Sequence, residues 1–152
     1  MISDSIVTIE SDAFISTGGM SIEYGLPYLK KIHIGKNVKN IEAPGFRINA
    51  WYPLVASDDE IQNGTKMTVD PENKWFTMYE KGLYTKDLTE LLWYPPQATE
   101  IHLPQTLKQI GTRALFYCSI SEIDIPYGTL KLDEFAFIEC TKLKKSICLT
   151  AY

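Results

Sequence analysis

The chain has 152 residues, of which 45% are hydrophobic and 22% are charged, and its formal net charge is −4. This composition is typical of one folded domain, rules against a disordered chain and gives no electrostatic reason to expect binding to nucleic acid or to an anionic membrane. No apolar run approaches the roughly 18 residues of a membrane helix, and the first ten residues lack the basic start and apolar core of a signal peptide.

Short strands are predicted wherever an apolar residue, any residue and another apolar residue follow one another, because this alternation buries one face of a strand. In chain order these steps begin at Ile32, Met67, Ile101, Ile123 and, less clearly, Ile147. Gly, Asp or Pro directly follows the first four steps. Proline cannot donate to a strand ladder and glycine favours a turn, so the strands are expected to be short.

A hairpin is predicted between the second and third of these strands. Residues Leu83–Thr85 and Glu90–Tyr94 form two apolar runs, and the polar segment Lys86–Thr89 between them is typical of a turn. The aromatic residues crowded into this region include Trp75, Tyr79, Tyr84, Trp93 and Tyr94. Two interpretations stay open: the rings cover a coil that lacks its own return segment, or they form a platform on which a ligand such as a sugar stacks.

A second pattern recurs along the chain. An aliphatic residue is followed four positions later by a small residue and five positions later by a large apolar residue, starting at Ile9, Ile41, Ile110 and Leu132. Ile110 and Leu132 are 22 residues apart, and so are the strand steps at Ile101 and Ile123. A period in the twenties is typical of leucine-rich repeats, in which stacked coils of one strand and one return segment share a continuous core.

Two of the three cysteines, Cys118 and Cys140, occupy the same place in successive repeats. They are expected to stack about one strand spacing, roughly 4.8 Å, apart. Buried free thiols suit such a ladder because cysteine is small and apolar, while a disulfide and a reactive thiol are the alternatives. Cys148 lies at the alternate position of its strand, and no Cys/His spacing indicates a zinc site.

The segment "IHLPQTLKQIGTRALFYCSISEIDIP", residues 101–126, follows the pattern "LxxIxIPxxVxxIGxxAFxxCxxL" nearly throughout. On these residues the chain resembles the BspA-type leucine-rich repeat family. It departs from the pattern at Leu115, where phenylalanine is usual, and lacks one residue after Cys118. "RINAWYPLVASDDEIQNGTK", residues 47–66, fits no consensus.

The resemblance implies an α/β solenoid, a right-handed β-α superhelix that is rich in strands and has short helical turns and an inserted β-hairpin. We expect one domain over residues 1–152 with about four to five coils and the hairpin near residues 72–96. A fragment of a longer array is the alternative.

The outward positions of the predicted strands form the candidate binding surface, because repeat folds use such extended faces for recognition. One row contains His33, Thr68, His102 and Asp124, with Cys148 as its expected continuation, and the flanking row contains Lys31, Lys66, Glu100 and Glu122, continued by Ser146. The flanking row changes from basic to acidic along the chain. The alternative is that these residues only keep the strand surface soluble. The two histidines are expected roughly two strand spacings apart, too far to share a metal.

The residues indicate no enzyme, cofactor or metal site, since no nucleophile has an adjacent base and no glycine-rich phosphate loop or metal cluster occurs. The resemblance implies a secreted or cell-surface module for adhesion or protein recognition, with an unidentified partner such as a host or matrix protein. Carbohydrate binding at the aromatic hairpin and a purely structural role are the alternatives, and a cytoplasmic location stays open. A last strand without a return segment also predicts end-to-end self-association through an apolar edge.

Overall fold

The computed structural model describes residues 4–11, 13, 15–16, 24–25, 31–42, 66–96 and 98–148. The chain divides into two compact units, unit 1 from Met1 to Trp75 and unit 2 from Phe76 to Tyr152. Each unit is described by itself. Within the described ranges no helix has the length and hydropathy that crossing a bilayer requires.

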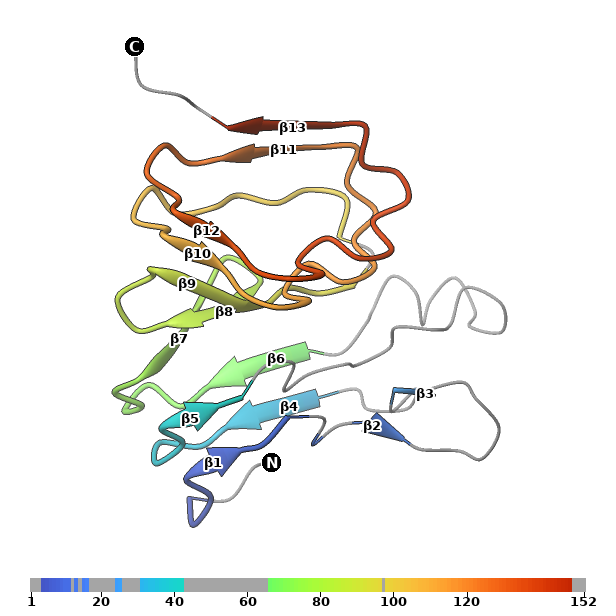
Figure 1. Ribbon diagram of the computed structural model, residues 1–152. Helices are drawn as coiled ribbons and strands as arrows, with labels where there is room; N and C mark the ends of the chain where they lie inside the picture. Colours follow the sequence, from blue (N-terminus) through green and yellow to red (C-terminus); the bar gives the residue numbers. More distant parts are fainter. Residues whose placement is uncertain are drawn as a thin grey trace. The chain divides into compact units, whose positions relative to one another are not determined.

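Unit 1 contains the parallel pairs that the repeat predicts. Its strands are β1 (Thr8–Ile9), β2 (Ile15–Ser16), β3 (Tyr24–Gly25), β4 (Lys31–Ile34), β5 (Asn40–Ile41) and β6 (Lys66–Val69). β1 pairs in parallel with β5, and β4 pairs in parallel with β6 (Figure 1). Ile9 lies opposite Ile41 and Ile32 lies opposite Met67. The predicted equivalence of these positions is therefore confirmed.

Unit 2 combines a hairpin with stacked coils. Its strands are β7 (Phe76–Tyr79), β8 (Gly82–Thr85), β9 (Glu90–Trp93), β10 (Gln109–Ile110), β11 (Glu122–Ile125), β12 (Lys131–Leu132) and β13 (Lys145–Cys148). One sheet has the order β12-β10-β9-β8-β7, and β11 and β13 form a separate parallel pair (Figure 1). The predicted hairpin is confirmed as β8 and β9, and β7 extends it on the far side as an antiparallel strand.

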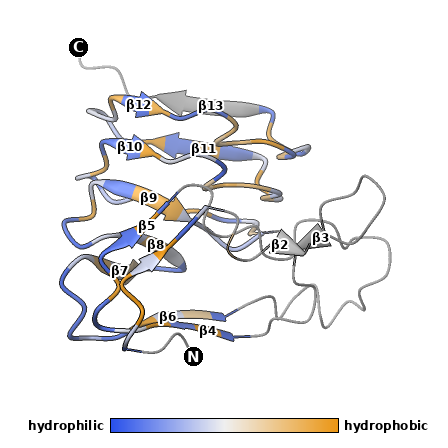
Figure 2. Cartoon of the chain, turned by 60° about the horizontal axis from the view of Figure 1, so that its bottom comes forward, coloured by the Kyte–Doolittle hydropathy of each residue, from blue (hydrophilic) through white to orange (hydrophobic). Residues whose placement is uncertain are grey.

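The core of unit 2 is built by the aliphatic residues of the repeat. Leu91, Ile110 and Leu132 lie in register on β9, β10 and β12, and hydrophilic and hydrophobic residues follow one another along β10 and β12 (Figure 2). On β11, Ile123 and Ile125 are buried between exposed acidic residues. Each fully buried aliphatic side chain contributes roughly 1.5–3 kcal/mol. Stacking thus buries what a single coil would expose.

The return segments are runs of hydrogen-bonded turns. The amides of Ala114 and Ala136 donate to the carbonyls three residues earlier, and those of Cys118 and Cys140 repeat this bond four residues on. The described residues contain no helix, so the expected short helical turns are not confirmed, and the right-handed superhelix stays a prediction.

The two returns also share an uncommon backbone conformation. Arg113 and its equivalent Phe135 have φ angles of 57° and 61°, and Tyr117 and its equivalent Glu139 have φ angles of 61° and 60°. Positive φ is uncommon for residues other than glycine. Its recurrence 22 residues later shows that both coils turn in the same way.

Gly111 explains the glycine that follows the aliphatic residue in the repeat pattern. Its amide donates to the Leu91 carbonyl of the preceding coil at 2.9 Å. A Cβ atom at this position would lie 2.9 Å from the same carbonyl oxygen. Because that oxygen belongs to the backbone, it cannot move aside cheaply, so glycine permits the close approach of the two coils.

The strand that the sequence predicts at Ile101–Leu103 is wrong. Residues 100–104 have no ladder partner in the described part of unit 2. The backbone of His102 instead hydrogen-bonds the Tyr94 hydroxyl. This segment therefore contacts the Tyr94 side chain rather than a neighbouring strand.

Candidate functional site

The strand face of unit 1 places the predicted residues side by side. Lys31 lies opposite Lys66, and His33 lies opposite Thr68, on the parallel strands β4 and β6. Both lysines are exposed, while His33 and Thr68 are partly buried. Residues at matching positions of neighbouring strands project from the same face. Two ammonium groups therefore share one edge of this face.

His33 is held by the strand beside it. Its Nδ1 lies 2.9 Å from the Thr68 hydroxyl, and its Nε2 lies 3.9 Å from a carboxylate oxygen of Asp70. The Thr68 hydroxyl also reaches the Ile32 carbonyl at 3.4 Å. When that hydroxyl donates to Ile32, His33 donates through Nδ1. The sequence placed His33 and Thr68 in one row, and the structure joins them as a polar link between strands.

The outward face of β11 in unit 2 is acidic. Glu122 and Asp124 are exposed on this strand, and Glu100 and His102 are exposed on a segment that forms no strand. Glu122 and Asp124 alternate with buried isoleucines on β11 and so project together from it. Of the flanking row, Lys31 and Lys66 are exposed on strands of unit 1 and Glu122 is exposed on a strand of unit 2, while Glu100 lies outside the strands.

The expected continuation of these rows on β13 is wrong by one residue. Glu122 lies opposite Lys145 and Asp124 lies opposite Ile147, so Ser146 and Cys148 fall opposite Ile123 and Ile125. The sequence step "ICL" suggested that Ile147 matches Ile123, but these residues are 24 apart. The observed partner of Ile123 is Ser146, which is 23 residues away.

Most of the predicted aromatic platform lies in the core. The side chains of Tyr84, Trp93 and Tyr94 are 0%, 3% and 2% exposed. Tyr79 meets the Tyr84 ring edge-on, with the ring centroids 5.9 Å apart. Burial raises the pKa of Tyr94 to about 12, so its hydroxyl stays neutral. These residues behave as the covering of a coil.

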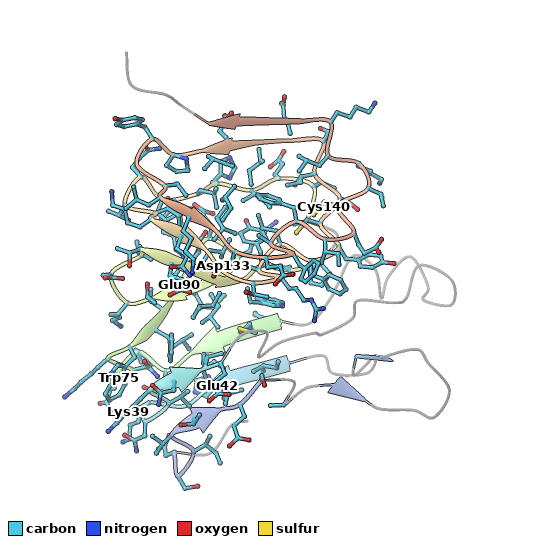
Figure 3. All side chains as sticks on the ribbon, in the orientation of Figure 1. Lys39, Glu42, Trp75, Glu90, Asp133 and Cys140 are labelled. Carbon is cyan, nitrogen blue, oxygen red and sulfur yellow. The ribbon has the colours of Figure 1, made fainter. Side chains whose placement is uncertain are left out.

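Trp75 and Tyr79 keep partial exposure. In unit 1 the Lys39 ammonium lies over the Trp75 ring, 5.3 Å from its centroid (Figure 3). A cation at this distance is attracted by the face of the ring. One face of the Trp75 ring is thus already engaged within unit 1.

The paired cysteines are free thiols that join successive coils. Cys118 is buried and Cys140 is half-buried. The Cys140 thiol donates to the Leu115 carbonyl of the preceding coil at 2.9 Å, and the Cys118 thiol approaches the Pro95 carbonyl at 3.7 Å. Each cysteine therefore contacts a carbonyl one coil earlier. This shared thiol–carbonyl contact explains why cysteine recurs at the same position of the repeat.

The two thiols should differ in reactivity. A hydrogen bond to Cys140, together with burial, raises the pKa of Cys118, and the same bond lowers the pKa of Cys140. Because the thiolate is the reacting form, we expect iodoacetamide at pH 8 to alkylate Cys140 at least about ten-fold faster than Cys118 in the native protein. Peptide mapping by mass spectrometry measures both rates. Equal native rates would contradict the assigned environments, and unfolding in guanidinium should equalise them.

The repeat geometry agrees with comparisons to known proteins. Residues 94–150 match the family model described as "BspA type Leucine rich repeat region (6 copies)". This segment contains the two coils with equivalent cysteines and turns. Residues 94–150 belong to the BspA-type leucine-rich repeat family. A search of curated proteins finds no match.

Solved structures share the fold of this chain. The pneumococcal vaccine antigen PcpA aligns with a TM-score of 0.61 and 22% identity over 78% of this chain and 27% of its own. A leucine-rich repeat protein from Eubacterium ventriosum has a TM-score of 0.57 and 24% identity over 77% of this chain and 35% of its own. A leucine-rich cell surface protein from Faecalibacterium prausnitzii has a TM-score of 0.51 and 18% identity over 95% and 45%. This chain thus spans less than half of each of these structures.

A polar row beside the aliphatic ladder of unit 2 was missed by sequence reasoning. Glu90, Gln109 and Lys131 lie in register on β9, β10 and β12. The Gln109 amide donates to Glu90 at 3.2 Å and to Asp133 at 2.7 Å, and Lys131 pairs with Asp133 at 2.6 Å. Figure 3 labels Glu90 and Asp133, which belong to the coils on either side of β10. The row fastens three strands of unit 2 to one another.

Unit 1 repeats this arrangement in its own ladder. Thr8 lies opposite Asn40, whose side-chain amide approaches the Thr8 hydroxyl at 3.5 Å. In both units the polar residue stands directly before the aliphatic residue of the repeat. That position could have revealed the row, because a polar residue directly before a buried one is expected to project from the opposite face of the same strand.

Glu90 gives this row a dependence on pH. Burial, followed by the charge of Asp133, raises the pKa of Glu90 above 4.5. The folded state then binds a proton more readily than the unfolded state, so Glu90 costs stability above its folded pKa, and the cost disappears as the pH falls through it. We expect Glu90→Gln to flatten the stability profile from pH 4.5 upward, measured by urea unfolding. Because Asp87 is exposed and its pKa is lowered, Asp87→Asn should not give this flattening. An unchanged profile in Glu90→Gln would contradict the assignment.

Proposed function

We propose that this protein is a non-enzymatic protein-binding or adhesion module of a cell-surface protein, which recognises its partner through the strand faces of its coils. The observation that carries the proposal is the alternation on these strands. Buried isoleucines hold β11 in place while Glu122 and Asp124 remain exposed, and Lys31 and Lys66 are exposed side by side on β4 and β6. Side chains fixed on a rigid ladder lose little freedom on binding.

The charges on the two faces indicate how a partner would be selected. A basic pair in unit 1 favours acidic groups, and the carboxylates of unit 2 favour basic groups. Charge complementarity at an interface mainly raises the association rate and excludes wrong partners. The cell-surface protein among the structural neighbours, from Faecalibacterium prausnitzii, supports the expected location. Because that identity is low, the support rests on the shared fold.

The test is capture of partners from host-cell and matrix extracts on the immobilised protein, followed by mass spectrometry. One variant carries Lys31→Glu with Lys66→Glu, and another carries Glu122→Lys with Asp124→Lys. Matched controls reverse exposed charges on return segments, as Lys142→Glu with Lys144→Glu and Glu134→Lys with Glu139→Lys. All variants should melt like wild type, because the altered side chains are exposed.

A protein captured by the wild type and by both controls, but lost from one face variant, would support recognition through that face. Binding should weaken at least about ten-fold and become less sensitive to salt. A partner that binds every variant equally would place recognition elsewhere. Glycans captured in preference to proteins would favour the carbohydrate alternative.

A further inference from the structure

The return segments that carry Cys118 and Cys140 are aligned by backbone hydrogen bonds. The amides of Leu115 and Tyr117 donate to the carbonyls 21 residues later, at 3.0 and 3.2 Å. In a parallel pairing, bonds of this spacing align residues that are 22 positions apart, which is also the register of β10 and β12. Cys118 and Cys140 are 22 positions apart, so they lie opposite each other on adjoining segments, and Figure 3 labels Cys140 on the later one.

The two side chains meet across this alignment. The thiols of Cys118 and Cys140 interact directly through a hydrogen bond. Opposite residues of adjoining parallel segments lie roughly 4.8 Å apart, and disulfides join residues whose Cα atoms lie about 4.4–6.8 Å apart. The spacing of the two segments therefore suits a disulfide without a large movement of the backbone.

Both thiol protons can be lost without leaving a carbonyl unpaired. The Leu115 carbonyl, which accepts the Cys140 thiol, also accepts the Cys118 amide at 3.3 Å. The Pro95 carbonyl, which the Cys118 thiol approaches, also accepts the Ala98 amide at 3.3 Å. A buried carbonyl that lost its last donor would oppose oxidation. Here each carbonyl keeps a backbone donor, so a bridge replaces only the thiol contacts.

We propose that Cys118 and Cys140 form a redox pair, which a peroxide oxidises to a disulfide between successive coils of unit 2. The site belongs to the return segments and is independent of the strand-face function proposed above. The bridge closes residues 118–140 into a loop. It therefore holds the two coils together in the oxidised protein, while the reduced protein keeps the free thiols.

The oxidation has two steps. The Cys140 thiol, whose pKa is lowered by its hydrogen bond with Cys118, loses its proton first. Its thiolate attacks one oxygen of hydrogen peroxide: an S–O bond forms, the O–O bond breaks, and the departing hydroxide takes up that proton as water. The Cys118 sulfur then attacks the sulfur of this sulfenic acid. The S–S bond forms, the S–O bond breaks, and the second hydroxide leaves with the Cys118 proton as water. Two thiols and one hydrogen peroxide thus give one disulfide and two water molecules.

Limited oxidation followed by peptide mapping tests the proposal. The reduced full chain is treated with equimolar hydrogen peroxide, the remaining thiols are blocked with iodoacetamide, and linked peptides are identified by mass spectrometry. The expected product is an intramolecular disulfide between Cys118 and Cys140, with Cys148 alkylated. The oxidised protein should melt about 5 °C or more above the reduced protein, because the bridge restricts the unfolded chain. Dithiothreitol should reverse this shift.

Three variants separate the roles of the thiols. In Cys118→Ser the sulfenic acid of Cys140 has no partner, so dimedone should label it at least about ten-fold more than in the wild type. In Cys140→Ser, Cys118 should stay reduced, while the control Cys148→Ser should form the bridge like the wild type. Thermal melting of the reduced variants verifies folding, and if Cys118→Ser does not fold, the mapping of the wild type decides.

Three results would each overturn the proposal. The first is a wild type that keeps both thiols after treatment with peroxide. The second is a main product in which Cys148 or a second chain supplies one of the bridged sulfurs. The third is a bridge between Cys118 and Cys140 that lowers the melting temperature, because the two segments would then be strained by it.

Discussion

Ile110→Asp should unfold unit 2. The Ile110 side chain is 0% exposed and lies between Leu91 and Leu132 of the neighbouring coils. A carboxylate there would be buried without a partner, which costs several kcal/mol beyond the lost apolar contacts. Domains of this size are stable by only about 5–15 kcal/mol. The expected result is loss of cooperative melting and of the β-sheet circular dichroism signal.

Leu132→Asp is the matched control. Leu132 occupies the same repeat position one coil later but is 51% exposed, so its carboxylate can remain hydrated. We expect this variant to melt cooperatively within a few degrees of wild type, since exposed substitutions usually change stability by less than about 0.5–1 kcal/mol. If Ile110→Asp melts like wild type, the assigned register is wrong. If both variants unfold, Leu132 is more buried than the 51% exposure of its side chain indicates.

The features predicted correctly from sequence are those that depend on residues near one another in the chain or one period apart. Ile9 lies opposite Ile41 in unit 1, and Ile110 lies opposite Leu132 in unit 2, because residues one period apart take matching places on successive strands. The turn between β8 and β9 is encoded locally: the Asp87 carboxylate accepts bonds from the hydroxyls of Thr85 and Thr89. Such bonds favour a turn whatever surrounds it.

The features predicted incorrectly depend on hydrogen-bond partners that the local sequence does not identify. Ile101–Leu103 has the alternation of a strand, but the backbone of His102 hydrogen-bonds the Tyr94 hydroxyl instead of a neighbouring strand. The turn between β7 and β8 has no clear sequence signal. It contains Glu80, which adopts a positive φ of 51° although it is not glycine. The candidate site was found in part, since alternation identifies exposed positions. Alternation cannot identify the hydrogen bonds that link Gln109 to Glu90 and Asp133.

Asn73 is the clearest example of a residue whose role could not be predicted from the local sequence. It lies in the segment "DPENKW", where asparagine suggests only a turn, yet its side chain is 1% exposed. Its amide nitrogen donates to the carbonyls of Gly35 and Val38 at 2.9 and 3.1 Å. Its side-chain oxygen accepts the Trp75 amide at 2.8 Å. One side chain therefore joins the turn after β4 to the turn after β6.

Asn73→Ala should destabilise unit 1 by about 3 kcal/mol, because each buried group that loses its partner costs roughly 1–3 kcal/mol. Urea unfolding measures the loss, and hydrogen exchange should locate it in residues 31–42 and 66–75, with residues 76–148 less affected. Asn37→Ala is the control, since its side chain is exposed and bonds only the Asp4 carbonyl in the described part of the chain. A loss in Asn73→Ala no larger than in the control would show that water replaces the amide. A larger loss with faster exchange in the turn after β4 would show that a buried asparagine, outside the apolar pattern of the repeat, holds successive coils of unit 1 together.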